Sequence, residues 1–157
     1  MRLSSEAYRE LLTGLLAEGQ TVLTRVRGSS MTPAVPDGAT ARLEPLGRQP
    51  VRGGEVVITR TPHGLLCHRV LTARRDQRVE TWGDTCHAPD EPVPAQEVLG
   101  RLVALEVEGQ WRTLAPRPAW HMRGRWLKYR LRKLLGLIDD RNAASCTAAP
   151  DDEEGGV

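Results

Sequence analysis

Hydrophobic and polar residues alternate in short runs along most of the chain, and glycine or proline turns separate the runs. Turn pairs such as Gly53-Gly54, His63-Gly64 and Gly83-Asp84 mark the breaks. The alternating runs cover residues 22–27, 39–43, 55–59, 65–72, 78–82, 98–107 and 111–114. Short strands with a turn about every 8–12 residues are typical of an all-β sandwich or a partly open barrel. The pattern therefore predicts a mainly β fold built from short strands.

Helical spacing replaces the alternation at two places. Apolar residues at 8, 11, 12, 15 and 16 predict an N-terminal helix over residues 5–18, with a serine as its N-cap. A second helix is predicted over residues 117–138, with apolar residues at 120, 127, 131, 134, 135 and 138 and basic residues mostly on the other side. We therefore expect one β domain over residues 1–116, the second helix, and a disordered acidic tail over residues 139–157.

The composition indicates a soluble globular protein. A chain of 157 residues with net charge +2 suits one domain with a substantial core. No run approaches the roughly 18 apolar residues of a spanning helix, and charged residues interrupt the N-terminal segment before it resembles a secretion signal. Cys67, Cys86 and Cys146 have unrelated spacings, which indicates no disulfide framework and a reducing compartment. We expect a cytoplasmic location.

The small net charge conceals a separation of charge near the C-terminus. Seven Lys or Arg and no acid lie between Arg117 and Lys133, whereas residues 139–157 carry six acids and one Arg. The basic helix has three interpretations: it covers the sheet with its charges solvated, it lies on the anionic inner face of a membrane, or it holds an acidic leader segment of a substrate. Nucleic acid is not an expected partner, because no DNA-reading motif accompanies the basic patch.

The most distinctive turn is Gly28-Ser29-Ser30-Met31-Thr32-Pro33. Glycine permits a close bend, while Pro33 and Pro36 prevent a helix or an inner strand from continuing. A serine hydroxyl is therefore held at a rigid corner. Serine becomes an effective nucleophile only when a base within hydrogen-bond reach accepts its proton.

His68 is the best candidate for that base. Of the four histidines, it alone lies inside an alternating strand, where its ring would be fixed relative to the fold. Asp84 and Asp90, both in the loop after residues 78–82, could each orient its imidazole. His63, Cys67, His68, Cys86 and His87 lack the spacing of a zinc motif, so we expect neither a metal nor another cofactor.

Taken together, these motifs resemble the type I signal peptidase family, whose superfamily also contains the repressor-type autoproteases. The resemblance covers about residues 22–107 and rests on four motifs in the same order: Gly28-Ser29-Ser30-Met31-Thr32-Pro33, Gly54-Glu55-Val56-Val57, His68-Arg69-Val70, and Gly83-Asp84 with Asp90. It implies a serine peptidase of that fold in which Ser30, the serine before Met31, is the nucleophile rather than Ser29.

The resemblance also implies roles for the base and the acid. A lysine precedes the Arg-Val pair in the bacterial branch, whereas His68 stands there in this chain, as in the serine–histidine branch. In that branch the orienting acid lies six residues after the Gly-Asp aspartate, which selects Asp90 and leaves Asp84 as a supporting residue.

Three departures from the family pattern bear on activity. Gly28 stands where a serine often helps to hold the oxyanion, so stabilisation would fall mainly on backbone N–H groups around Ser30, with Ser29 in support. Met31 is a further supporting residue of this turn. Glu55 replaces the aspartate of the Gly-Asp strand start. We expect the chain to lack the membrane anchor and the long apolar segment usual in signal peptidases.

The expected function is therefore a soluble serine endopeptidase that cleaves a peptide or protein precursor, with leader removal during peptide maturation as one such reaction. The substrate would lie extended and add a strand to the edge of the sheet. The alternative is a catalytically inactive peptide-binding module of the same fold. A self-cleaving repressor is disfavoured, because no pair of DNA-binding helices precedes the motifs.

Overall fold

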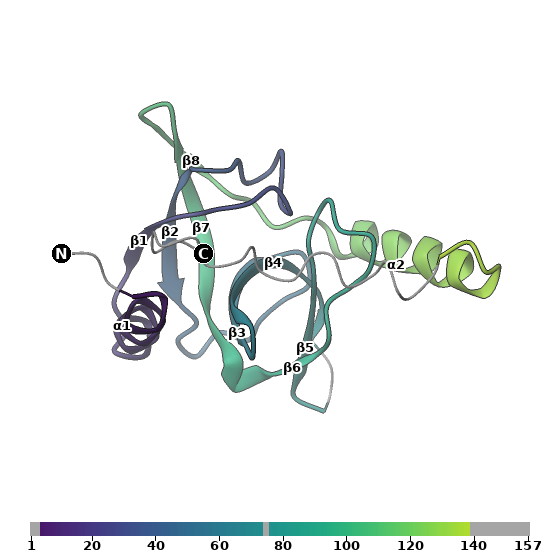
Figure 1. The fold of residues 1–157 in the computed structure, drawn as a ribbon, viewed down its shortest axis with the longest axis horizontal. Coiled ribbons are helices and arrows are strands. Elements are labelled where there is room, and N and C mark those ends of the chain that lie inside the picture. Colours follow the sequence, from purple (N-terminus) through teal and green to yellow (C-terminus); the bar gives the residue numbers. More distant parts are fainter. Residues whose placement is uncertain (1–3, 74–75, 139–157) are drawn as a thin grey trace.

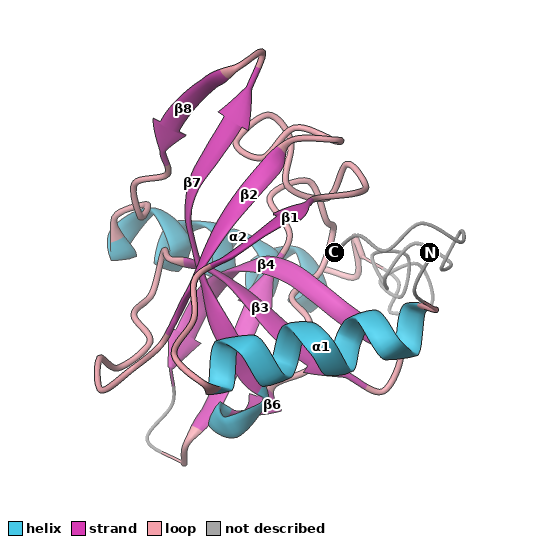
Figure 2. Ribbon diagram, turned by 90° about the vertical axis from the view of Figure 1, so that its left-hand side faces the viewer, coloured by secondary structure: helices cyan, strands magenta, loops and turns pink. Residues whose placement is uncertain are grey.

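The computed structural model describes residues 4–73 and 76–138, in which eight strands form one antiparallel sheet (Figures 1 and 2). The order across the sheet is β1-β2-β7-β3-β4-β5-β6, and β8 pairs with β7. The strands are β1 (Val22–Arg25), β2 (Thr40–Pro45), β3 (Val56–Thr61), β4 (Gly64–Ala73), β5 (Arg78–Trp82), β6 (Val93–Pro94), β7 (Val98–Val107) and β8 (Gln110–Thr113).

The sheet curves without closing, since β1 and β6 lie at opposite ends of the strand order. The prediction of a mainly β, partly open fold with an N-terminal helix is confirmed. The sequence pattern missed β6 and the short 3-10 helix Ala95–Glu97 that follows it. Two strand residues, one of them a proline, are too few to produce a visible alternation.

Helix α1 (Ser5–Ala17) begins at the expected serine cap, because the Ser4 side chain accepts a hydrogen bond from the Ala7 N–H at 3.2 Å. Its apolar face packs against the sheet through Leu12 and Leu16, which are 1% and 3% exposed. A side-chain hydrogen bond between Tyr8 and Thr24 ties the helix to β1. Gly100 permits this close packing, because a Cβ there would lie 2.8 Å from the Glu44 carbonyl oxygen and 3.3 Å from Leu16.

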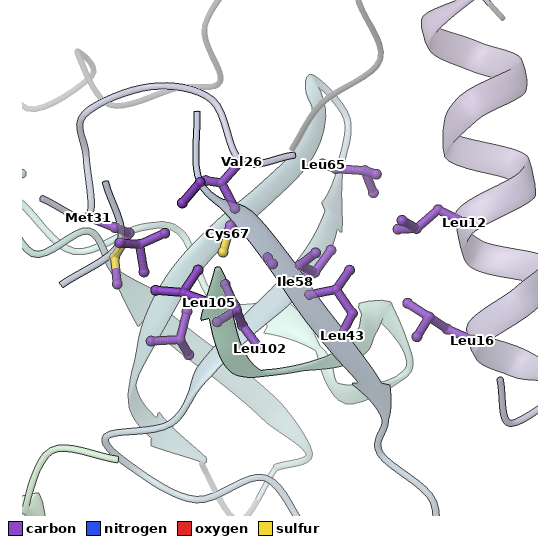
Figure 3. Close-up of a cluster of buried hydrophobic side chains, with 14 residues drawn as sticks. Leu12, Leu16, Val26, Met31, Leu43, Ile58, Leu65, Cys67, Leu102 and Leu105 are labelled. Atoms are coloured by element: carbon purple, nitrogen blue, oxygen red, sulfur yellow. The ribbon is translucent and has the colours of Figure 1, made fainter. Parts of the chain in front are cut away.

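The main hydrophobic core links α1 to the turn that carries Ser30. Figure 3 shows Leu12 and Leu16 at one end of this cluster and Met31 at the other. Met31 is 2% exposed and Val35 is fully buried. Fully burying an aliphatic or methionine side chain contributes about 1.5–3 kcal/mol, so the residue directly after Ser30 anchors that turn in the core.

Helix α2 (Ala119–Leu134) lies at the opposite end of the sheet from α1 (Figures 1 and 2). It docks through Met122, which is fully buried, and through Tyr129, whose ring meets Trp82 edge-on at 5.5 Å. The apolar positions that predicted this helix are not its docking face, since Leu127 and Leu131 are 64% and 56% exposed. The interpretation that the helix simply covers the sheet therefore fails for its apolar side.

In the part of the chain that the structure describes, no helix is both long enough and apolar enough to cross a membrane. The expected disordered tail over residues 139–157 lies outside the described residues.

Candidate active site

The turn that carries Ser30 follows β1 and is held by its own backbone. Gly28 adopts φ +92°, a conformation that favours glycine, and its N–H donates to Asp37 Oδ1 at 2.8 Å. The Ser29 carbonyl accepts from both the backbone N–H and the hydroxyl of Thr32, at 3.1 and 2.8 Å. The half-buried Ser30 therefore sits on a tightly bonded corner.

A second loop holds the same turn from the other side. The Thr85 N–H donates to the Ser30 carbonyl at 2.9 Å, and the Thr85 hydroxyl donates to the Ser29 carbonyl at 3.1 Å. Thr85 follows Gly83-Asp84 directly in sequence. Two of the sequence motifs, the serine turn and the Gly-Asp loop, are thus bonded to each other.

His68 lies in β4, between β3 and β5, and its side chain is only 1% exposed. Its Nε2 is 2.9 Å from Ser30 Oγ, and its Nδ1 is 2.6 Å from Asp90 Oδ2. Ser30, His68 and Asp90 therefore form a continuous hydrogen-bonded chain from hydroxyl to imidazole to carboxylate. With Nδ1 protonated toward Asp90, Nε2 is free to accept the hydroxyl proton.

Asp90 is fixed by strand β5. Its N–H donates to the Thr81 carbonyl at 2.9 Å, and the Thr81 hydroxyl donates to Asp90 Oδ2 at 2.7 Å. The same carboxylate oxygen thus accepts from both Thr81 and His68. Thr81 was not among the predicted site residues, although its place in an alternating run, just before Trp82-Gly83, was a usable signal.

Asp84 contacts arginines and not His68. Its two carboxylate oxygens accept from Arg69 Nε and Nη2, each at 2.9 Å, and Arg117 Nη1 lies 3.2 Å from Oδ1. The Arg69 and Asp84 side chains are 1% and 2% exposed. Arg69 Nη1 also donates to the Gly54 carbonyl at 2.9 Å. Asp84 therefore belongs to a buried ion-pair cluster beside the Ser30–His68–Asp90 chain.

Glu55 points into a different network. Its Oε2 accepts from Arg101 Nε at 3.2 Å and from the Arg52 N–H at 2.9 Å. Arg101 in turn donates to the carbonyls of Leu46, Gln49 and Pro50. Glu55 thus fixes the loop before β3.

The remaining candidate ligands do not gather around a common point. His63 and His87 are exposed, in separate loops. Within residues 4–73 and 76–138, no group of three His, Cys, Asp or Glu side chains is arranged to hold a metal ion.

The cysteines differ from each other in chemistry. Cys67 is a free, buried thiol, and burial raises its pKa to about 12. Cys86 is disulfide-bonded, so the expectation that the chain has no disulfide is wrong at this residue. Cysteine spacing alone does not reveal which residues the fold brings together, so the bond could not be predicted from the sequence.

The loop Gly83–Cys86 also rests on α2, an interaction that the sequence analysis missed. Arg125 Nη2 donates to the carbonyls of Gly83 and Cys86 at 2.7 and 2.9 Å. Its guanidinium lies over the Trp82 ring, 3.9 Å from the centroid. Burial is the main cause that lowers the pKa of Arg125. Helix α2 therefore supports the loop that bonds to the Ser30 turn.

An open antiparallel sheet with an N-terminal helix, together with this hydrogen-bonded chain, defines a protein with a peptidase-type or autoprotease fold. Comparison with known families agrees, since the model of the Peptidase S24-like family matches residues 3–109. The chain belongs to the Peptidase S24-like family. No curated protein and no solved structure matched the chain.

Proposed function

We propose that the protein is a serine endopeptidase of the serine–histidine type, with Ser30 as nucleophile, His68 as base and Asp90 as orienting acid. The observation that carries this proposal is the unbroken contact from Ser30 Oγ through His68 to Asp90, with distances of 2.9 and 2.6 Å. A general base must lie within hydrogen-bond reach of the proton it removes, and His68 Nε2 meets that condition.

In the proposed reaction, His68 Nε2 takes the proton of Ser30 Oγ as that oxygen attacks a peptide carbonyl. The imidazolium that forms is stabilised by Asp90 and returns the proton to the leaving amine. His68 Nε2 then takes a proton from a water molecule as the water oxygen attacks the acyl carbonyl. The imidazolium returns that proton to Ser30 Oγ as the ester bond breaks, and the acyl group leaves as a carboxylic acid. The Thr81 hydroxyl keeps Asp90 aligned throughout, since it bonds the oxygen that faces His68.

The Ser30 backbone N–H is the proposed donor to the oxyanion. Two other amides of the turn are already bonded: the Gly28 N–H donates to Asp37 Oδ1, and the Thr32 N–H donates to the Ser29 carbonyl. Among the described residues, the Ser30 N–H has no acceptor. Loss of a single oxyanion donor costs about 100- to 1000-fold in rate in a well-studied serine protease, so we expect a slow enzyme with Gly28 in place of a serine.

The substrate class we propose is a peptide or protein precursor, as the resemblance to signal peptidases implies, with leader removal during peptide maturation as the reaction. A fluorophosphonate probe tests the chemistry without a known substrate. We expect the full-length protein to be labelled at Ser30, as located by mass spectrometry, and labelling to fall by about 100-fold or more in Ser30→Ala and in His68→Ala.

Ser29 provides the internal comparison, because it is the adjacent serine and is exposed. Labelling at Ser29, or undiminished labelling in Ser30→Ala, contradicts the assignment. Cleavage of a candidate precursor by His68→Ala at the parent rate contradicts it as well.

One observation favours a second function, that of a non-catalytic peptide-binding module. Gly28 offers no hydroxyl, and its N–H is already bonded to Asp37, so the proposed oxyanion site has few donors. Tight binding of a precursor peptide, measured by calorimetry, without fluorophosphonate labelling or cleavage would support this function and exclude the peptidase.

A further inference from the structure

Helix α2 uses only one of its faces to dock on the sheet. The docking residues are Met122, Arg125 and Tyr129, which lie three and four residues apart and so share one side of the helix. Met122 is fully buried, and both Arg125 and Tyr129 contact Trp82. The face opposite to these three residues is therefore turned away from the sheet.

That opposite face carries a row of exposed apolar residues, which we call the outer stripe: Trp120, Leu127, Leu131 and Leu134. With about 3.6 residues per turn, separations of seven, four and three residues keep these side chains on one line along the helix. Their exposed fractions are 73%, 64%, 56% and 79%. Figure 1 shows the helix extending outward from the sheet, and no described residue covers the stripe. Contiguous apolar surface of this kind marks a binding surface.

Cations border the outer stripe on both sides. At about 100° per residue, Arg123 and Arg130 fall on one flank, and Lys128 and Arg132 fall on the other. All four are exposed, and residues 117–138 contain no acid. The surface is therefore an apolar row between two rows of positive charge.

We propose that the outer stripe inserts into the interface of an anionic lipid bilayer, with α2 lying in the plane of the surface. An apolar row flanked by cations matches the acyl boundary and the headgroup phosphates of such a surface at the same time. The long Lys and Arg side chains reach outward to the phosphates while their stems cover apolar surface. Trp120 suits this depth, because its ring is apolar and its N–H is polar.

Charge argues against packing of the outer stripe on the same stripe of a second copy. Two copies that met along the stripe would bring their flanking cations together with no acid from either helix to neutralise them. A bilayer with anionic lipids supplies the opposite charge over the whole length of the helix.

Membrane docking of α2 would affect where the proposed peptidase works, although the docking proposal does not depend on peptidase activity. The loop Gly83–Cys86 rests on the inner side of α2 through Arg125, and Thr85 of that loop bonds the Ser30 turn. With the outer stripe in the lipid, this loop would lie on the side of α2 that faces away from the bilayer, and the Ser30 turn would lie next to the loop. Precursors held at a membrane would be favoured substrates.

The test is flotation of the full-length protein with vesicles of phosphatidylcholine alone or mixed with phosphatidylglycerol. We expect binding to the anionic vesicles, weaker binding as salt rises, and little binding to phosphatidylcholine. The double variant Leu127→Ser, Leu131→Ser should bind at least about tenfold more weakly, because it removes two inserted leucines. Arg123→Glu with Arg130→Glu should also weaken binding, and that loss should be greatest at low salt.

Two matched controls separate the stripe from general surface effects. Leu23→Ser changes a leucine of β1 that is 59% exposed, and Arg112→Glu changes an exposed arginine of β8. Both should bind vesicles as the parent does. The stripe side chains are exposed, so circular dichroism should show the stripe variants to be folded.

Failure of the parent to float with anionic vesicles overturns the proposal, as does equal binding by the stripe variant. A dimer in sedimentation analysis that depends on the stripe, without vesicle binding, also overturns it and assigns the stripe to a second copy. Fluorophosphonate labelling of Ser30 in solution does not require the stripe. It therefore shows separately whether the peptidase proposal stands.

Discussion

The imidazole ring of His68 is held in place by direct contacts with three other residues. Ser30 and Asp90 bond its two ring nitrogens, and the backbone of Gly83 lies against its ring. A Cβ at Gly83 would lie 2.8 Å from His68 Nε2 and 2.3 Å from Cys86 Sγ. Glycine is thus required here for space, since any side chain would push against the atom proposed to receive the Ser30 proton.

Gly83→Ala should lower fluorophosphonate labelling of Ser30 by about 100-fold, because a displacement near 1 Å of a reacting group costs about that much. The measurement is the labelling rate of the full-length protein. Gly14→Ala is the control, since a Cβ at Gly14 meets nothing within 4 Å. Equal rates for parent and Gly83→Ala would show that the ring position is not critical.

Cys67 offers a second prediction for a single residue, based on burial. Burial raises its pKa from the ordinary 9.0 to about 12, and the nearby Arg69 lowers it only in part. The native thiol should therefore resist iodoacetamide at pH 8 and react once the protein is unfolded, because the thiolate is the nucleophile. Rapid alkylation of the native protein at Cys67, mapped by mass spectrometry, would contradict this prediction.

The same shift has a defined sign for stability. The unfolded thiol ionises at a lower pH than the folded thiol, so unfolding is favoured as the pH rises above 9.0. Below that pH, Cys67 is protonated in both states and makes no pH-dependent contribution.

Helix α2 acts on the site as an element, through the contacts of Arg125. One guanidinium nitrogen bonds two carbonyls of the loop Gly83–Cys86, and the same group stacks on Trp82. That loop carries Thr85, which bonds the backbone of Ser29 and Ser30. The family match ends at residue 109, so this support comes from a part of the chain outside the matched region.

Arg125→Ala should lower the free energy of unfolding by about 1–3 kcal/mol, through lost hydrogen bonds and a lost cation–π contact. It should also slow the labelling of Ser30, because the loop loses its support. Arg123→Ala removes an exposed arginine from the same helix and should change neither quantity. Denaturant unfolding and labelling rates measure the two effects. An Arg125→Ala protein with parent stability and labelling would show that α2 does not support the loop.

At the scale of the whole molecule, three of the four sequence motifs meet in one buried cluster. Arg69 bonds the Gly54 carbonyl and both oxygens of Asp84, and so joins its own motif to two others. Arg117 adds a second cation to Asp84 at 3.2 Å and connects the chain before α2 to the same point. The Arg69 and Asp84 side chains are almost completely buried.

Asp84→Asn should destabilise the protein by about 3–5 kcal/mol, because it leaves the buried Arg69 charge without its partner. Glu44→Gln is the matched control. It breaks an ion pair with Arg42 in which both side chains are 46% exposed, and such surface pairs contribute about 0–1 kcal/mol. Denaturant unfolding of both variants gives the comparison, and equal losses of stability would contradict the structural role of Asp84.

Periodicity and turn residues in the sequence were sufficient for the local structure. Alternation located β3, β4, β5 and β7 to within a few residues, and the serine cap located the start of α1. The resemblance of the four motifs to the signal peptidase family was sufficient to propose Ser30, His68 and Asp90 together. The strands and the helix start are readable because they depend on neighbouring residues and on the preferences of the backbone.

Only the tertiary structure decided which surfaces meet. It placed Asp90 against His68 and Asp84 against Arg69, although both aspartates follow the same strand. It also turned the apolar row of α2 outward and buried Met122 instead. A periodic pattern specifies that one helix face is apolar, but the space left on the sheet determines which face docks. Such contacts join residues far apart in sequence, and spacing along the chain does not contain them.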